Sequence, residues 1–312
     1  MQAIPKIDKI NFNFRLLIIY SIVDYRKTKI MNTENIKHIL MPIDFSDCAI
    51  NAKNTAIIIA KRQGSKITLL EIIPAVPANY GLSIDNIVIK QQDTVLQNSE
   101  AKLKLLAAEI SYKHKIDVNY ICLLGETITL ICETAKVQNV DLIVMGTHGV
   151  SGFKEFFIGS NSFAVVEKAK CPVLIIPLAT AISEFKQIMF PVRNIPNALG
   201  KYTFLRKIID VNKSNLVVFG VDDASVHEAI NHLMESVNYF NHSIKDDDVT
   251  TTTCFMVKDA NLADEVLNKT KEMNCDLIVI TSKLDTTFTE YFMGTFTQRI
   301  VNHSTVAVLH VR

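Results

Sequence analysis

Glycine and hydroxyl residues gather near the middle of the chain in a pattern suited to phosphate binding. An apolar run ends in Gly146, Gly149 lies three residues further on, and the segment Gly159–Ser162 comes after nine more. The apolar run predicts a buried parallel strand, and the last segment predicts the start of a helix. Glycine lets the backbone approach a ligand, the N–H groups of a helix start attract an anion, and serine hydroxyls add hydrogen bonds without charge.

The same residues also fit an interpretation without any ligand. No lysine follows Gly159, so the segment is not a Walker A loop, and the spacing of a Rossmann fingerprint is absent. Glycines at a turn between strand and helix, with Gly159 and Ser160 as an ordinary helix cap, would explain the pattern equally well. The choice between the two interpretations depends on the rest of the chain.

Composition and charge restrict the class of protein. The chain has 312 residues, enough for two domains, and 48% hydrophobic with 21% charged residues is a globular composition. Lys and Arg number 33 against 32 Asp and Glu, so nothing favours nucleic acid as a partner. The six cysteines are scattered without paired spacing or clustered histidines. This pattern indicates reduced core thiols, Cys48 and Cys171 among them, a cytoplasmic protein and no metal site.

The first 34 residues differ in character from the rest of the chain. Ile10–Val23 is apolar behind basic residues, but Arg15 interrupts it, no cleavage site comes after it, and it is too short to span a bilayer. We expect residues 1–34 to be a dispensable leader, or the product of an upstream start with Met31 as the working start. A weak membrane anchor is the alternative; otherwise no membrane association is expected.

The chain contains two copies of one unit. The segment around Pro42 returns around Pro191, at an offset of 149 residues, and Asp141-Leu-Ile-Val returns as Asp276-Leu-Ile-Val, at an offset of 135. The second copy is therefore about fourteen residues shorter in its middle. Such self-similarity predicts two tandem domains, which we place at residues 35–180 and 184–312.

Apolar runs and helical patterns alternate within each copy. In the first copy we predict strands at His38–Asp44, Lys66–Ile73, Val118–Leu123, Leu142–Gly146 and Val173–Ile176, and helices at Cys48–Gln63, Ile87–His114, Glu126–Gln138 and Ser160–Lys168. In the second copy the predicted strands are Gln187–Val192, Asn215–Val221, Thr251–Val257, Leu277–Thr281 and Val306–Val311. Alternation predicts an α/β fold with a parallel sheet, helices on both faces and a ligand crevice at the carboxyl ends of the strands.

The glycine pattern is eroded in the second copy. Thr281 stands where the first copy has Gly146, Leu284 where it has Gly149, and Arg193 where it has Asp44. Side chains thus occupy positions where a phosphate needs bare backbone. Gly294 and the two threonines after it persist, and we interpret them as a helix cap.

The motifs resemble the universal stress protein family over about residues 35–312. Gly146, Gly149, Gly159 and Ser160 match the G-x-x-G, nine residues, G-S/T pattern of its nucleotide-binding members. The resemblance implies two flavodoxin- or Rossmann-like domains, each a five-stranded parallel sheet of strand order 3-2-1-4-5 with helices on both faces. It also implies that the first domain binds ATP, with Mg²⁺ as companion ion.

The resemblance assigns a role to each part of the crevice. Asp44 would face the adenosine, the Ile72 backbone would hold the adenine, and the glycine segments would wrap and close over the phosphates. The implied ligand-binding residues are Pro42, Ile43, Asp44, Ile72, Met145, Gly146, His148, Gly149, Gly159, Ser160, Asn161 and Ser162. Asp44 could instead cap the next helix, His148 could be merely solvated, and Lys154 is left outside the site.

These observations favour a cytoplasmic stress-response module with an adenine nucleotide in the first domain and a structural or regulatory second domain. A slow ATPase or phosphotransferase is one alternative, with His148 as the sole candidate base and no catalytic dyad. A nucleotide-free scaffold for protein interaction is the other. We expect the strands Val173–Ile176 and Val306–Val311 to join the domains as an intramolecular pseudo-dimer; a homodimer and an unidentified protein partner are compatible with this.

Overall fold

A computed structural model describes most of the chain. The described residues are 35–75, 85–147, 160–178, 184–193, 199–209, 213–222, 227–247, 249–257, 261–281 and 290–312. The predicted leader and three predicted site residues, His148, Gly149 and Gly159, lie outside them. The domain boundaries at residues 35–180 and 184–312 stay predictions.

The first domain alternates strand and helix throughout. Its elements are β1 (His38–Pro42), α2 (Asp47–Gln63), β2 (Lys66–Ile73), α3 (Asp85–His114), β3 (Val118–Leu124), α4 (Thr127–Val137), β4 (Leu142–Gly146), α5 (Ser160–Lys168) and β5 (Val173–Ile176). The predicted strands and helices are recovered to within two residues at each end. The short apolar runs flanked by polar turns were sufficient to locate them.

The second domain repeats the plan. Its elements are β6 (Gln187–Val192), α6 (Lys201–Ile208), β7 (Asn215–Asp222), α7 (His227–Ser243), the 3₁₀ turn η1 (Lys245–Asp247), β8 (Thr250–Val257), α8 (Leu262–Glu272), β9 (Leu277–Thr281), α9 (Glu290–His303) and β10 (Ala307–Val311). All five strands predicted for this copy are present. The shortening lies largely in one helix, because α7 has 17 residues where α3 has 30.

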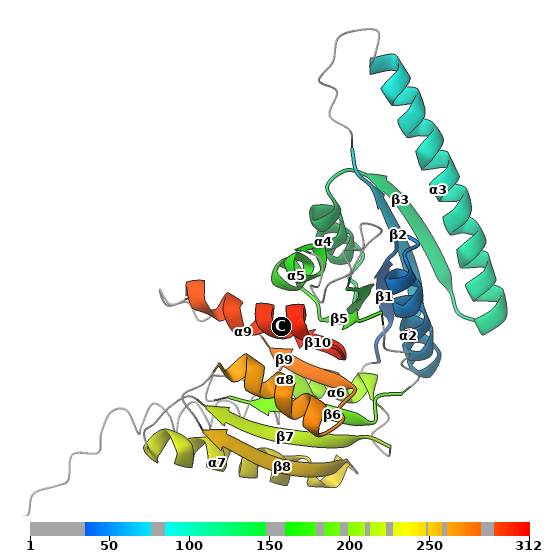
Figure 1. Ribbon diagram of the computed structural model, residues 1–312. Helices are drawn as coiled ribbons and strands as arrows, with labels where there is room; N and C mark the ends of the chain where they lie inside the picture. Colours follow the sequence, from blue (N-terminus) through cyan, green and yellow to red (C-terminus); the bar gives the residue numbers. More distant parts are fainter. Residues whose placement is uncertain are drawn as a thin grey trace, which may run out of the picture.

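The ten strands form one sheet in the order β3-β2-β1-β4-β5-β10-β9-β6-β7-β8. Within each domain the pairing is parallel and follows the predicted order 3-2-1-4-5. At the centre β5 and β10 run antiparallel, with Leu174 opposite Leu309. The two last strands therefore join the domains within one chain, as predicted, and Figure 1 shows the continuous, twisted sheet that results.

Helices cover both faces of this sheet and create two cores. One core gathers buried residues of α2, α3, α6 and α7, for example Ala52, Leu103 and Leu205. The other gathers residues of α4, α5, α8 and α9, for example Ile131 and Val165. The central strands are buried on both faces, which explains their nearly continuous apolar sequence.

One aspartate in each domain explains the repeated Asp-Leu-Ile-Val sequence. Asp141 accepts hydrogen bonds from the backbone N–H groups of Lys37 and His38, at 2.8 and 2.9 Å. Asp276 does the same with Lys186 and Gln187, at 2.7 and 3.2 Å. Each carboxylate thus ties the start of its domain's fourth strand to the start of its first, and desolvation by burial raises the pKa of Asp276. This repeat is structural.

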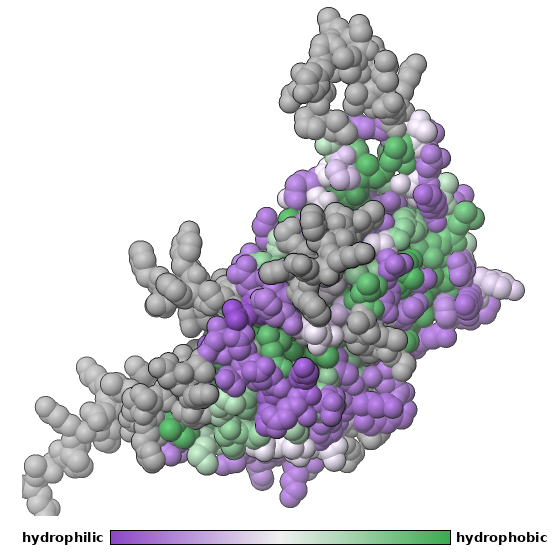
Figure 2. Space-filling model, viewed as in Figure 1, coloured by the Kyte–Doolittle hydropathy of each residue, from purple (hydrophilic) through white to green (hydrophobic). Residues whose placement is uncertain are grey.

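The helix α3 extends beyond the sheet at its N-terminal end (Figure 1). Leu105 and Tyr112 on its outer side are exposed at 72% and 82%. In the space-filling view hydrophobic and hydrophilic residues alternate along this helix, whereas α8 in the second domain is covered mainly by hydrophilic ones (Figure 2).

No helix in the described part of the chain is both long and apolar enough to cross a membrane.

Candidate functional site

The predicted site residues of the first domain that the structure describes lie at the carboxyl edge of its sheet. Pro42 ends β1 and Gly146 ends β4, and these two strands are neighbours although the chain leaves them in opposite directions. Ile72 lies near the end of β2, on the other side of β1. This is the switch point at which an open α/β sheet leaves a crevice.

The side chains around the ends of β1, β2 and β4 are apolar. Ile43 is 4% exposed and its N–H donates to the Leu70 carbonyl at 2.9 Å, which continues the β1–β2 pairing past Pro42. Met145 is 7% exposed, and Ile72 packs partly buried against the same core. Ile43 belongs to the core on one face of the sheet, and Met145 and Ile72 to the core on the other, so this edge is apolar on both faces and these side chains add no charge.

Asp44 organises the turn between β1 and α2. Its Oδ1 accepts hydrogen bonds from the N–H and the hydroxyl of Ser46, at 3.0 and 2.6 Å. Ser46, not Asp44, is the N-cap of α2, and its hydroxyl accepts from the Ala49 N–H at 3.3 Å. Phe45 between them has a φ of 60°, a left-handed conformation that costs about 1 kcal/mol or more for such a residue. The alternative that Asp44 itself caps α2 is therefore wrong; Asp44 instead holds the capping residue Ser46 in place.

Gly146 is required by packing. A Cβ at this position would lie 2.7 Å from the backbone carbonyl carbon of Cys48, in the first turn of α2. Real Cβ atoms do not approach a backbone so closely, so any side chain here would push α2 away from β4. The glycine pattern therefore has a structural cause at Gly146, whether or not a phosphate lies nearby.

Ser162 joins the start of α5 to the end of β4. It is 3% exposed, and its hydroxyl lies 3.0 Å from the Gly146 carbonyl oxygen and 3.3 Å from that of Thr147. The donor of this hydroxyl is therefore used within the protein, which the sequence did not reveal. Asn161 beside it is exposed, and Ser160 is the first residue of α5. The bond holds the N–H groups of the first turn of α5 at the carboxyl edge of the sheet.

Glu71 is a polar residue of this region that was not predicted from the sequence. It precedes Ile72 on β2, under α3, and its Oε1 accepts a hydrogen bond from the Ser99 hydroxyl at 3.2 Å. Burial, and to a smaller degree the nearby Asp44 charge, raises the pKa of this carboxyl. The sequence feature that could have indicated this residue is a single glutamate inside the largely apolar run Lys66–Ile73.

The equivalent edge of the second domain carries cations. The Arg193 guanidinium, at the position of Asp44, lies 4.5 Å from the ring centre of Phe296, which stands at the position of Asn161. Lys201, 4% exposed, donates from Nζ to the Pro191 carbonyl at 2.5 Å and lies 4.4 Å from the Phe190 ring centre. Burial, with a smaller effect of the Arg193 charge, lowers the pKa of Lys201 to about 7.

One prediction for the second domain is wrong. The sequence predicts Gly294 as part of a helix cap, but α9 begins at Glu290, so Gly294 and the threonines after it lie inside the helix. A glycine within a helix costs only about 1 kcal/mol, which the burial of Ile300 and Val301 readily offsets. The segment that opens α5 in the first domain therefore no longer opens a helix in the second.

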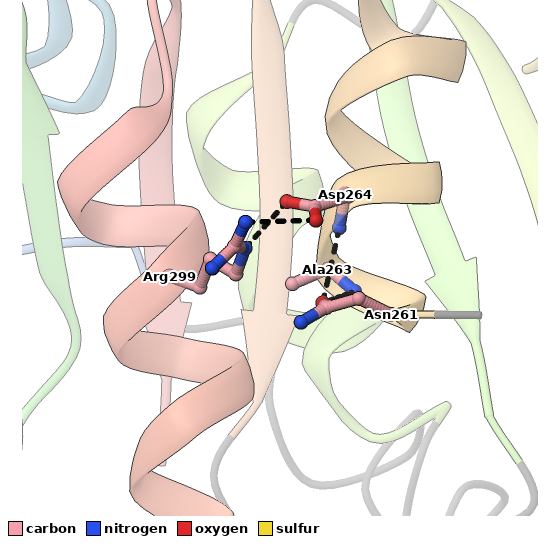
Figure 3. A network of polar contacts seen from close by, with 4 residues as sticks. All are labelled: Asn261, Ala263, Asp264 and Arg299. Carbon is pink, nitrogen blue, oxygen red and sulfur yellow. Dashed lines mark hydrogen bonds and ion pairs between the residues drawn. The ribbon is translucent and has the colours of Figure 1, made fainter.

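The helices α8 and α9 are fastened to each other. Figure 3 shows Arg299 of α9 reaching Asp264 of α8, with its Nε 2.5 Å from Oδ1 and its Nη2 2.8 Å from Oδ2. Asn261 caps α8 by accepting from the N–H groups of Ala263 and Asp264, at 3.1 and 3.3 Å. The first domain has Thr129 and Ala164 at the positions of Asp264 and Arg299, so this ion pair belongs to the second domain alone.

The described residues contain no cluster of three or more His, Cys, Asp or Glu side chains that could hold a metal ion. The six cysteines are free, and Cys48 and Cys275 are buried. Desolvation raises the pKa of Cys171 to about 11 and that of Cys275 to about 12, so both thiols stay protonated at neutral pH. Neither of these two thiols is therefore an activated nucleophile.

Comparisons with known proteins agree with this architecture. The model of the universal stress protein family matches residues 35–177 and 217–312. The universal stress protein YxiE of Bacillus subtilis is 32% identical over 152 residues, which are 44% of this chain and 96% of that protein. MJ0531, a universal stress protein of Methanocaldococcus jannaschii, is 31% identical over 153 residues, 47% of this chain and 86% of that protein.

Among solved structures, a universal stress protein from Archaeoglobus fulgidus matches with a TM-score of 0.67 and 18% identity, covering 89% of this chain and 97% of that one. A universal stress protein from Pseudomonas aeruginosa matches with a TM-score of 0.62 and 15% identity, covering 88% and 93%. Both likenesses extend over the two domains and show that they share this fold.

Proposed function

Because the chain belongs to the universal stress protein family, we propose that it is a cytoplasmic stress-response module whose first domain binds ATP. The second domain, in this proposal, is a structural or regulatory partner without a nucleotide of its own. Binding of ATP to the folded first domain would stabilise it and change the surface offered to another protein.

The bond between Ser162 and the Gly146 carbonyl carries this proposal. It fixes the N-terminus of α5, with its unpaired N–H groups and positive dipole end, at the switch point of the sheet. The first turn of α5 contains no acidic residue that would compete with a phosphate. A triphosphate there would have its base near Ile72.

The chemistry of the donors fits a magnesium nucleotide. The described residues offer the backbone N–H groups at the start of α5 for phosphate oxygens, and Asp44 for a polar group of the nucleoside. Mg²⁺ binds through substrate phosphates and water in many nucleotide sites, so a protein cluster of ligands is not required. The ion would supply positive charge to the phosphates. We propose no catalytic residue.

The contrast with the second domain supports the same assignment. Larger side chains occur at this edge of the second domain: Arg193 packs on Phe296 at the positions of Asp44 and Asn161, and Lys201 is buried beside Phe190. A nucleotide could enter there only by displacing these side chains. One site per chain is therefore part of the proposal.

The test measures the melting temperature with and without millimolar MgATP. We expect a rise for the wild type and for Gly294→Leu in the second domain, but none for Gly149→Leu or Gly159→Leu in the first. Equal rises in all four proteins, or no rise in any of them, would contradict the proposal.

A second measurement separates a nucleotide-binding module from a bare scaffold. The purified protein is denatured, and the absorbance of the supernatant near 260 nm is recorded before and after dialysis against EDTA. Adenine nucleotide in the supernatant of the wild type and its absence from Gly159→Leu is the expected result.

A further inference from the structure

A cavity lies between the two domains, at the opposite end of the sheet from the nucleotide crevice. Its volume is about 310 Å³, close to the lower end of the range of small-molecule sites, about 300–1,000 Å³. The first domain contributes the residues next to the starts of β1, β4 and β5, and the second contributes one face of α6. The lining includes Asp141, Lys170, Cys171, Pro172, Phe204 and Lys207.

The lining carries an excess of positive charge. Lys170 comes from the first domain and Lys207 from the second, and the described part of the chain shows no ion pair for either. Asp141 is the only carboxylate among the lining residues, and its Oδ2 already accepts the N–H groups of Lys37 and His38. Because its raised pKa keeps the Cys171 thiol neutral, no further negative charge compensates the lysines.

This charge breaks the internal symmetry of the molecule. At the offsets that relate the two copies, Thr305 corresponds to Lys170 and Ile58 corresponds to Lys207. Asp276 corresponds to Asp141 and makes the same backbone bonds. The aspartate that accepts the backbone N–H groups is thus present in both domains, whereas the positions equivalent to the two lysines hold uncharged residues. Folding of the repeat does not explain them.

Hydrogen bonds hold the segments that line the cavity in place. The Gln63 side chain, at the end of α2, donates from Nε2 to the Lys207 carbonyl at 2.5 Å, across the junction. The Pro172 carbonyl accepts the Ile143 N–H at 3.0 Å, which holds the loop before β5. The Lys207 ammonium lies 5.8 Å from the ring centre of Phe204. A ligand here would therefore meet walls from both domains that are already in place.

We propose that this cavity binds a small anion, a carboxylate or phosphate compound, between the ammonium groups of Lys170 and Lys207. The two domains each supply one cation, so the ligand would add a charged link across the junction and strengthen the docking of the second domain on the first. The inference is independent of ATP binding, since the cavity and the nucleotide crevice lie at opposite ends of the strands.

The experiment titrates the wild-type protein with sodium phosphate and, separately, sodium citrate, at ionic strength matched with sodium chloride, and monitors the melting temperature. We expect a saturable rise with at least one of the two anions, and the arm that responds identifies phosphate or carboxylate as the preferred group. Lys170→Gln and Lys207→Gln should each weaken the apparent affinity about tenfold, as expected for a charge-assisted hydrogen bond.

The controls make the outcome decisive. Lys104→Gln removes an exposed lysine of α3 and should respond like the wild type. An absent rise in the wild type, or an equal rise in the Lys170→Gln/Lys207→Gln double variant, would overturn the proposal. The double variant should keep its full response to MgATP, so that failure of the anion site and failure of the nucleotide site are told apart.

Discussion

The two domains share one fold but differ at the edge where ligands bind in this architecture. Strand order, the β1–β4 tether through Asp141 or Asp276, and the buried strands recur in both. At the carboxyl edge, the first domain has an aspartate, a glycine and a serine, and the second has an arginine, a buried lysine and an aromatic ring. Residues that maintain the fold were kept, and those at the crevice diverged, because fold and function place separate demands on a sequence.

The difference extends to how firmly the helices are held. In the first domain α5 is attached near its start by the Ser162 hydroxyl, next to the glycine segment. In the second, α9 begins earlier and is fastened to α8 by Arg299 and Asp264. The start of α5 is thus attached to the sheet, whereas α9 is attached to a neighbouring helix. Equivalent substitutions in the two domains should therefore have unequal effects.

The largest effect should come from Lys201 in the second domain. Burial lowers its pKa from 10.5 to about 7, so between these values the unfolded chain binds more protons and stability rises with pH. Below pH 7 the full cost of burying the charge is present. Lys201→Met should therefore raise the free energy of unfolding at pH 7 by about 2–4 kcal/mol, after allowance for the lost cation–π contact.

Urea unfolding of the wild type and Lys201→Met at pH 7 and pH 10 checks this. The rise in the free energy of unfolding caused by Lys201→Met should be smaller at pH 10 than at pH 7. The control is Leu205→Met, a change at a buried neighbour in α6, whose effect should not depend on pH. A gain that is the same at both pH values would show that Lys201 is not buried in its neutral form.

The next effect concerns Gly146 and its counterpart Thr281. Gly146→Ala places a methyl group 2.7 Å from the Cys48 backbone, so α2 must shift, at a cost of about 3 kcal/mol. Thr281 already carries a side chain, and α6 begins ten residues after Pro191, whereas α2 begins five after Pro42. Thr281→Ala should therefore cost less than about 1 kcal/mol. If urea unfolding shows that Gly146→Ala and Thr281→Ala lose equal free energies of unfolding, a packing role for Gly146 is contradicted.

A smaller effect is expected at Ser162. Ser162→Ala removes the hydroxyl that bonds to the Gly146 and Thr147 carbonyls and should cost about 1 kcal/mol of stability. Because α5 would lose its attachment to β4, the dissociation constant for MgATP should also rise several-fold. Thr297→Val, the equivalent change in the second domain, should alter neither quantity. Calorimetric titration and urea unfolding of both variants provide the measurement.

Much of the fold was predictable from the sequence, for a physical reason. Buried parallel strands must be apolar and end at turns, so the predicted runs His38–Asp44, Leu142–Gly146 and Val173–Ile176 located the strands to within two residues. The order of the strands in both halves was predicted from the resemblance to the universal stress protein family. The start of α9 was missed, because a glycine within a helix costs too little to mark a helix boundary.

The site was less predictable, since its details depend on contacts distant in sequence. The need for Gly146 comes from Cys48, and the hydrogen bond of Ser162 goes to a strand end sixteen residues earlier. Nothing local to Lys201 predicts that its ammonium is buried beside Phe190. The cavity at the domain junction requires the docked pair of domains, which no segment of sequence describes alone.

The smallest effect should come from the ion pair of Arg299 and Asp264 (Figure 3). Both side chains are partly exposed, so solvent screens their attraction, although the two-point geometry favours it. Arg299→Met keeps the helix and removes the charge; it should lower the melting temperature slightly in dilute buffer and not at all in molar sodium chloride.

The reciprocal pair of changes in the first domain, Thr129→Asp with Ala164→Arg, should fasten α5 to α4. If closure of α5 over a nucleotide requires freedom between these helices, that variant will bind MgATP more weakly; unaltered affinity would show that such freedom plays no part.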